Sequence, residues 1–356
     1  MFSLREMAAP SKEFLHQAAL CIALSLVPGA GAQQPAEAHA YVLDAQVSGT
    51  LRIWGHGNPH AQYMGDLLRA WEEGFRKVQP QVRFENGMTG NASAIGGLFT
   101  GAADISFMDR EIWATELDAF QQGTGHNPYS VAVATGSLAR PNHAPALVIF
   151  VNRDNPLTRI TLAQLDAIFG ADHRRSQGTV RTWGQLGLKG EWAAQRIHPY
   201  GYGILRRQSQ YFEHEVLMGS QKWNCDLREF STLRKKDGSI LPAPQQILAA
   251  LAKDRYGIAF ATLEFDEPGV KSLAIAQKDG DAPVAPTQAS VASRAYPLAQ
   301  TLYAYIDRAP GKELDPRVKE FLAYVLSSQG QQILKQLHGY LPLTDAMVKQ
   351  QREKLQ

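Results

Sequence analysis

One arrangement occurs three times in the sequence: a short apolar run enters a glycine-rich polar loop that leads directly into an amphipathic helix. The runs and loops are "LRIW" with "GHGNPH", "VRFEN" with "GMTGNAS", and "QRIHPY" with "GYG". Strand, tight loop and helix form the unit of an α/β sheet, so the repetition predicts an α/β protein. The predicted helices carry apolar residues at helical spacing: Met64, Leu67, Leu68, Trp71 and Phe75; Ile95, Leu98 and Phe99; and Leu205, Phe212, Val216 and Leu217.

This arrangement predicts a local anion site. In an α/β sheet the helix N-termini gather at the carboxyl ends of the strands, where ligands bind. Each N-terminus presents unpaired N–H groups and roughly half a positive charge. The chain has 36 Lys and Arg against 34 Asp and Glu, a formal charge of +2. No net field large enough to hold nucleic acid or an anionic membrane is expected.

The segment "ADISFMDREI" places Asp109 and Arg110 directly after a short apolar strand. In one interpretation, Asp109 caps the helix "REIWATELDAF" and Arg110 is solvated. In the other, Asp109 lies in the anion site, where a carboxylate accepts a hydrogen bond only from a ligand that carries a proton. That would favour hydrogen phosphate over sulfate.

The first 32 residues predict a secretory signal. Arg5 and Lys12 precede an apolar run, and Ala30 and Ala32 suit a cleavage site. We expect a mature, periplasmic chain that starts near Gln33.

Two cysteines occur in the sequence. Cys21 would leave with the signal unless it is lipid-modified, and Cys225 would then be the only thiol, which excludes an internal disulfide. No His lies beside Cys225, so it is not expected to be a nucleophile.

The composition along the chain predicts two lobes, with the first one discontinuous. The segments "SLARPNHAP" (137–145) and "DAPVAPTQAS" (281–290) have the Pro-rich character of connections between lobes. The expected organisation is a signal (1–32), a flexible leader (33–48), lobe 1 (49–140 and 291–346), lobe 2 (141–290) and a C-terminal tail (347–356).

The chain resembles the periplasmic phosphate-binding proteins that serve ABC importers, over most of 49–343. The stretches that carry the resemblance are "GHGN", "GNAS", "GAADISFMDREI", "PALVIFVNRDNPLTRITLAQLDAIF", "TWGQLG", "GIAFATLEF" and "YPLAQTLYAYIDRAPGKELDPRVKEFLAYVLSSQGQQILKQLHGYLPL". The resemblance implies a two-lobed type II periplasmic binding fold, in which each lobe is a mixed sheet flanked by helices. It also implies an oxyanion held in the cleft between the lobes by amides, hydroxyls, an Asp and an Arg.

Carried over by position, Asn58 and Asn91 fall where the family offers Thr or Ser hydroxyls, and Asp109 matches the acid that reads the phosphate proton. The third loop, "HPYGYGIL", departs from the family pattern of Arg, Asp and Gly-Ser-Gly-Thr. Backbone amides remain there, and Arg206 or Arg207 could supply the charge. The expected ligand-binding residues are Gly57, Asn58, Gly90, Asn91, Asp109, Tyr202, Gly203, Ile204 and Arg206.

No metal or cofactor is expected. His56 and His60 are four residues apart, as in some zinc sites, but they flank a helix start and no third ligand is indicated. Neither glycine-rich loop has the third Gly of a dinucleotide fingerprint.

Three functions remain open. The leading one is a non-enzymatic, monomeric binding protein that delivers phosphate or a related oxyanion to the membrane permease of an ABC importer. The altered third loop motivates the second, a binding or sensing module with a different anion specificity. The third, a secreted phosphate-ester hydrolase, lacks a recognisable metal cluster or nucleophile–base pair.

Overall fold

A computed structural model describes residues 39–57, 63–141 and 143–356. The predicted signal, its cleavage point near Gln33 and the candidate ligand residue Asn58 lie outside these ranges, as does His60. Within them, no helix combines the length and the apolar character needed to cross a bilayer.

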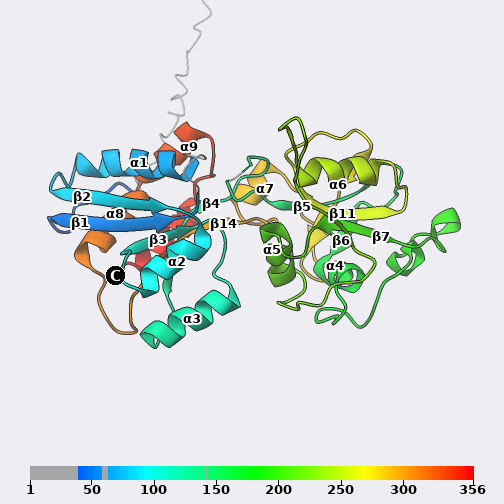
Figure 1. Cartoon of the computed structure of the whole chain (residues 1–356), viewed down its shortest axis with the longest axis horizontal. Coiled ribbons are helices and arrows are strands. Elements are labelled where there is room, and N and C mark those ends of the chain that lie inside the picture. Colours follow the sequence, from blue (N-terminus) through cyan, green and yellow to red (C-terminus); the bar gives the residue numbers. More distant parts are fainter. Residues whose placement is uncertain (1–38, 58–62, 142) are drawn as a thin grey trace, which may run out of the picture. The chain divides into compact units, whose positions relative to one another are not determined.

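The first sheet has the strand order β2-β1-β3-β14-β4 (Figure 1). The strands β1, β2 and β3 are parallel, whereas β14 runs antiparallel to β3 and β4. Neighbouring residues of a strand face opposite sides. Phe107 therefore packs in the cluster of Trp71, and Met108 in the cluster of Leu98. The bounds are β1 (Gly49–Gly55), β2 (Val82–Met88), β3 (Ile105–Met108), β4 (Tyr129–Thr135) and β14 (Thr301–Ile306).

The second sheet has the order β12-β5-β11-β7-β8 and is also mixed. It has its own hydrophobic core, in which the rings of Phe212 and Phe260 stack with centroids 4.3 Å apart. Its bounds are β5 (Leu147–Asn152), β7 (His198–Tyr202), β8 (Arg228–Phe230), β11 (Gly257–Thr262) and β12 (Val270–Ser272). Two small sheets pair β6 (Arg159–Thr161) with β13 (Ala274–Ala276), and β9 (Leu233–Arg234) with β10 (Ile240–Leu241).

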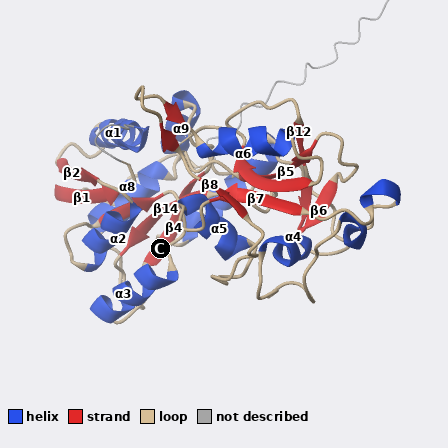
Figure 2. Cartoon of the chain, turned by 45° about the vertical axis from the view of Figure 1, so that its right-hand side comes forward, coloured by secondary structure: helices blue, strands red, loops and turns tan. Residues whose placement is uncertain are grey.

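Helices flank both sheets (Figure 2). In α1 the predicted apolar stripe is confirmed, since all five of its members are buried. Burying each such side chain contributes roughly 1.5–3 kcal/mol. The helices are α1 (Tyr63–Arg76), α2 (Asn91–Phe99), α3 (Ala114–Thr124), α4 (Leu162–Phe169), α5 (Arg207–Glu215), α6 (Ala243–Ala252), α7 (Gln288–Ala292), α8 (Pro316–Val325), α9 (Ser328–Leu337) and α10 (Asp345–Glu353), with the 3-10 helices η1 (Trp183–Leu186) and η2 (Gly190–Trp192).

Both ends of the first lobe differ from the sequence analysis. Residues 39–48, expected within a flexible leader, contact the folded chain: the amide of Ala45 donates to Glu320 Oε1 at 2.9 Å. The expected C-terminal tail forms most of α10, where Gln351 Oε1 accepts from the Ala132 amide of β4. A leader of low complexity can be held by a few buried polar groups, which its own sequence does not reveal.

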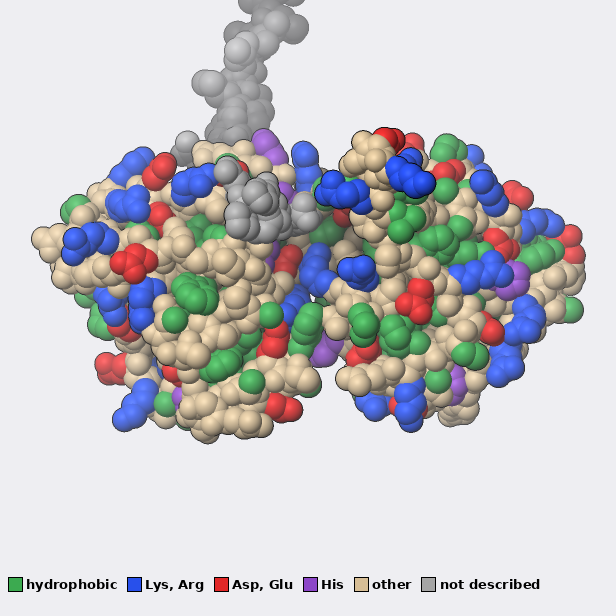
Figure 3. Space-filling view, in the orientation of Figure 1, with side chains coloured by type: hydrophobic (Ala, Val, Ile, Leu, Met, Phe, Trp, Pro, Cys, Tyr) green, Lys and Arg blue, Asp and Glu red, His purple; other side chains and the backbone are tan. Residues whose placement is uncertain are grey.

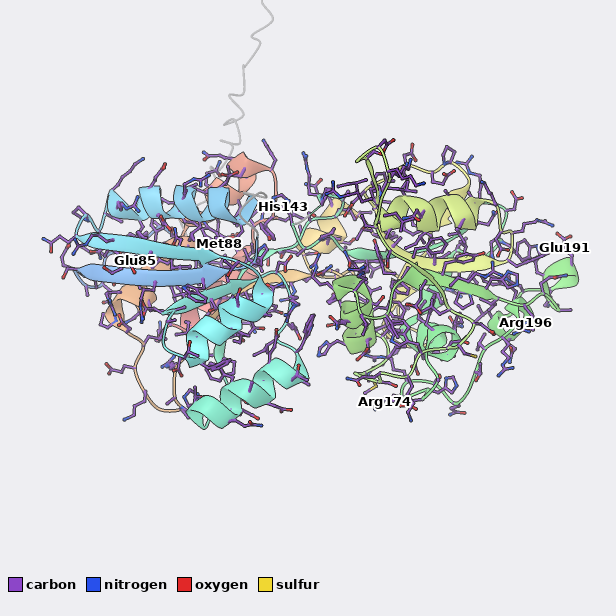
Figure 4. The ribbon with its side chains drawn as sticks, in the orientation of Figure 1. Glu85, Met88, His143, Arg174, Glu191 and Arg196 are labelled. Atoms are coloured by element: carbon purple, nitrogen blue, oxygen red, sulfur yellow. The ribbon has the colours of Figure 1, made fainter. Side chains whose placement is uncertain are left out.

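Two segments connect the two sheets. The chain passes from β4 to β5 through 137–145, and His143 of this segment is labelled in Figure 4. On the return, Val291, Tyr296 and Leu298 still belong to the second core. The second lobe therefore extends beyond the expected boundary at residue 290, because these apolar side chains need the core of the second sheet.

The third strand–loop–helix unit also differs in detail. "GY" (201–202) belongs to β7, and the loop is Gly203 to Arg206. Leu205, expected on the helix, precedes it and is 84% exposed. The helix α3 begins at Ala114, so Asp109 is not its N-cap and the capping interpretation is wrong.

Candidate functional site

Asp109 is the centre of the candidate site. It follows β3 at the carboxyl end of the strand, and only 4% of its surface is exposed. Its Oδ1 accepts a hydrogen bond from Asn91 Nδ2 at 2.8 Å, and its Oδ2 lies 3.2 Å from Arg207 Nη1. His56 Nε2 lies 4.0 Å from the same Oδ2. The buried carboxylate is thus surrounded by polar groups from three separate segments.

The Asp109 carboxyl is held in its charged form. Burial by itself would raise the pKa of Asp109, but the Arg207 guanidinium, the nearby His56 and the hydrogen bond from Asn91 outweigh it and lower the pKa to about 2. Burial lowers the pKa of His56, although the charge of Asp109 opposes this. Because His56 is then neutral near pH 7, we ascribe the stability of the Asp109 carboxylate to Arg207 and Asn91. At neutral pH Asp109 can only accept hydrogen bonds.

Arg207, rather than the expected Arg206, supplies the positive charge. Arg207 is the first residue of α5, which packs with the second sheet, and its Nη1 also donates to Gln300 Oε1 at 3.2 Å. Gln300 immediately precedes β14 of the first sheet. The Arg206 side chain is exposed. Arg207 therefore joins residues of both sheets at Asp109.

Asp109 and Arg110 of the "DREI" segment do not pair with each other. Arg110, which the capping interpretation left solvated, is buried and forms bidentate bonds of 2.7 and 2.6 Å with Glu116 of α3. Its guanidinium lies 3.5 Å from the centre of the Trp113 ring. Arg110 therefore stabilises the start of α3 and does not pair with Asp109, whose carboxylate faces Asn91 and Arg207.

Helix N-termini approach Asp109 from both sides. Asn91, which bonds to Asp109, is the first residue of α2, and Arg207 is the first residue of α5. In α5 the amide of Gln210 donates to Arg206 O, so the amides before it lie at the open end of the helix. Gly90 precedes α2 with φ 125°, a conformation that favours glycine. The sequence analysis expected an anion site at such helix termini.

A cavity of about 230 Å³ lies beside the start of α5. Arg206, Arg207 and Gln208 line it, together with Tyr202, Thr262 and Glu264. Burial raises the pKa of Glu264, while Arg207 opposes the rise. The cavity offers space for a ligand next to the Arg207 guanidinium.

The amides expected from the third loop are already used within the protein. The Gly203 amide donates to Phe230 O at 2.9 Å, and the Ile204 amide donates to Glu229 Oε2 at 2.8 Å. The Tyr202 hydroxyl is buried against Thr262 Oγ1, 2.8 Å away. The Gly203 and Ile204 amides therefore do not present free donors, which differs from the expectation, because β8 pairs with β7 and brings its own acceptors to the turn.

Sequence reasoning missed two members of the site. His56, considered only as a zinc ligand, follows β1 and hydrogen-bonds to Tyr340 at 2.5 Å. Its position was available from the pattern, since the carboxyl ends of β1 and β3 meet in a parallel pair. Gly57, the expected neighbour, has φ 144° and is half-buried. Gln300 carried no local signal, because only the antiparallel return of β14 brings it to Arg207.

One group of potential metal ligands occurs among the described residues. Donor atoms of Glu111, His214 and Glu215 lie within 4.8 Å of one another. The two His214 ring nitrogens face different carboxylates, Glu215 at 3.0 Å and Glu111 at 3.8 Å. His214 is exposed and the two glutamates are partly exposed, so the arrangement is typical of surface ion pairs.

Basic and acidic side chains are interspersed over the face shown in Figure 3. This distribution agrees with the near-zero net charge. The positive potential for an anion is therefore local, at Arg207 and the helix termini.

Comparisons with known proteins agree with this architecture. The PBP superfamily domain matches residues 44–329. The Phosphate-binding protein PstS of Pseudomonas aeruginosa is 32% identical over 299 residues, which cover 83% of this chain and 84% of that protein. Protein SphX of Synechococcus elongatus is 26% identical over 281 residues, 78% of this chain and 74% of that protein.

Solved structures show the same fold. PstS from Borrelia burgdorferi has a TM-score of 0.54 at 16% identity, covering 83% of this chain and 99% of that chain. An ABC-type phosphate transport receptor from Vibrio cholerae has a TM-score of 0.50 at 18% identity, covering 82% and 99%. The predicted type II periplasmic binding fold, with two mixed sheets flanked by helices, is confirmed. The chain belongs to the PBP superfamily and, within it, to the family of PstS.

Proposed function

We propose that this protein is an exported, non-enzymatic receptor that captures phosphate and delivers it to the permease of an ABC importer. The relatives support this function, because the P. aeruginosa protein is named for phosphate binding and the V. cholerae protein for ABC-type phosphate transport. We further propose that it acts as a monomer in the periplasm after loss of residues 1–32.

The observation that carries the proposal is the buried Asp109 carboxylate paired with Arg207. A sulfate ion has no proton to donate at neutral pH and would face a like charge, whereas hydrogen phosphate can donate its proton to Asp109. The Arg207 guanidinium has further N–H groups that can bind the phosphate oxygens while it remains paired. The amides at the starts of α2 and α5 complete the set of donors.

The proposed ligand-binding residues are revised accordingly. Asn91, Asp109 and Gly90 remain, Gly57 and Asn58 are kept from the sequence analysis, and Arg207 replaces Arg206 as the cationic partner. The first amides of α5 take the place of those of Tyr202, Gly203 and Ile204.

Calorimetry on the mature protein tests the proposal. We expect phosphate to bind the wild-type protein with measurable heat and sulfate to bind much more weakly. Asp109→Asn keeps the shape but can donate a hydrogen bond, so phosphate affinity should fall about 10- to 100-fold, the effect of losing one charged hydrogen bond, while sulfate binding improves. No phosphate heat from the wild-type protein, or equal phosphate binding by Asp109→Asn, would contradict the assignment.

The altered third loop is the reason to keep the sensing module as a second candidate. It requires that another anion bind better than phosphate, which arsenate and sulfate titrations on the same sample can reveal. A phosphatase assay tests the hydrolase: turnover that Asp109→Asn abolishes would replace the receptor with an enzyme.

A further inference from the structure

A carboxylate of the protein itself is bound to a backbone amide of the third loop. The carboxylate Oε2 of Glu229 accepts the hydrogen bond of the Ile204 amide at 2.8 Å. Glu229 is an exposed residue of β8, and its neighbour in the register is Gly201 of β7. A backbone amide next to a helix start is a donor that an anionic ligand could use. Here a side chain of the protein occupies it.

The Glu229 carboxylate lies near two residues that line the cavity beside Arg207. A methyl group added at Gly203 would lie 3.5 Å from Glu229 Oε2, 3.3 Å from Ser231 Oγ and 3.7 Å from Arg206 Cγ. Ser231 and Arg206 both line the cavity. The Glu229 carboxylate therefore lies near the residues that line the space where the proposed ligand would bind.

A negative charge in this position acts against an anion. It repels the ligand directly and offsets part of the attraction of the nearby arginines. It also holds the Ile204 amide, so a ligand that used this donor would have to displace the carboxylate. Neither effect is needed to hold β8, because the strand is already paired to β7 along its backbone.

We propose that Glu229 is a specificity-determining residue that weakens anion binding, through its charge and its hold on the Ile204 amide. The inference rests on the proposed function, since it assumes that phosphate binds beside Arg207. With Glu229 in place, the protein would need a higher phosphate concentration to fill its site than it would without this carboxylate.

Calorimetric titration of phosphate into three proteins tests this inference. Glu229→Gln removes the charge and keeps an oxygen that can accept the Ile204 amide, so its affinity should rise about 3- to 10-fold at low salt. The gain should shrink in 0.5 M sodium chloride, because salt screens an exposed charge. Glu229→Asp keeps the charge on a shorter side chain, and we expect a smaller gain than for Glu229→Gln.

Glu191→Gln is the matched control. Glu191 is an exposed glutamate of η2 that pairs with Arg255 at 2.8 Å, and Figure 4 shows it at the right-hand end of the view. Its substitution removes the same charge and should leave phosphate affinity unchanged. Circular dichroism of all variants checks that the fold is retained.

The outcomes separate the inference from the proposed function. If the wild-type protein binds phosphate and Glu229→Gln binds no tighter, or Glu191→Gln gains as much, the inference is wrong and the receptor stands. If the wild-type protein binds phosphate and Glu229→Gln binds it more tightly while Glu191→Gln does not, the inference is supported. If none of the proteins binds phosphate, both are wrong.

Discussion

Adjacent residues of one short segment have opposite roles in this protein. Asp109 and Arg110 could have paired with each other, yet Arg110 turns to Glu116 and Asp109 turns to Arg207. The reason is the backbone: β3 ends before Asp109, and α3 does not begin until Ala114, so the two side chains leave an extended segment in different directions. A carboxylate buried in this way needs partners in the folded state.

The stability of the protein should depend on pH through Asp109. The folded-state pKa, about 2, lies below the ordinary value, so the ionised carboxylate contributes stability above pH 4. From linkage, this contribution is about 2 kcal/mol and is lost as pH falls from about 4 towards 2. We expect Asp109→Asn to be less stable than the wild-type protein at pH 7 and the gap to narrow at pH 3, measured by urea unfolding.

Asp104→Asn provides a comparison, because Asp104 pairs with Arg52 near the surface. Its effect on the free energy of unfolding should be smaller at pH 7. A gap for Asp109→Asn that is the same at pH 7 and pH 3 would show that the ionised carboxylate does not stabilise the fold.

At the scale of the element, Gly97 allows α2 to pack closely against Trp54 of β1. A methyl group at Gly97 would lie 2.5 Å from Cε3 of Trp54, which is too close for any side chain. Gly96 has open space at the same distance. The helix that carries Asn91 to Asp109 can approach the sheet only because residue 97 has no side chain.

We expect Gly97→Ala to destabilise the protein by about 1–3 kcal/mol, since the helix or the indole must move. Gly96→Ala should be neutral or stabilising by up to about 1 kcal/mol, because alanine is the better helix former. Urea unfolding of the two variants measures both effects. Equal destabilisation would mean that helix flexibility, and not the contact with Trp54, requires these glycines.

The sequence predicted elements well where the signal is local. The stripe from Met64 to Phe75 predicts α1, because the helical spacing of its apolar residues can be recognised within a short stretch of sequence. Asp109 was placed in the site for the same reason, at the end of a buried strand. The choice between Arg206 and Arg207 depends on the residue at which α5 begins, and helix ends are the least certain part of a sequence-based prediction. Glu229 reaches the third loop only through the pairing of β8 with β7, which no local pattern reports.

At the scale of the whole molecule, each sheet has its own hydrophobic core, and Arg207 connects residues of both. A ligand that binds at Asp109 and Arg207 contacts groups whose positions depend on both cores. Ligand binding and folding stability should therefore be linked through this single pair.

Phosphate at 100 times its dissociation constant should raise the free energy of unfolding of the wild-type protein by about 2.7 kcal/mol. Arg196→Ala should retain most of this increase at the same phosphate concentration, because Arg196 is exposed and pairs with Asp226, whereas Arg207→Ala should lose most of it. Urea unfolding with phosphate, and with sulfate at matched ionic strength, measures the difference. Since the two arginines carry the same charge, a general effect of positive charge would weaken both variants equally. Such a result would mean that phosphate is held by a diffuse potential and that the contact between Arg207 and Asp109 does not form the binding site.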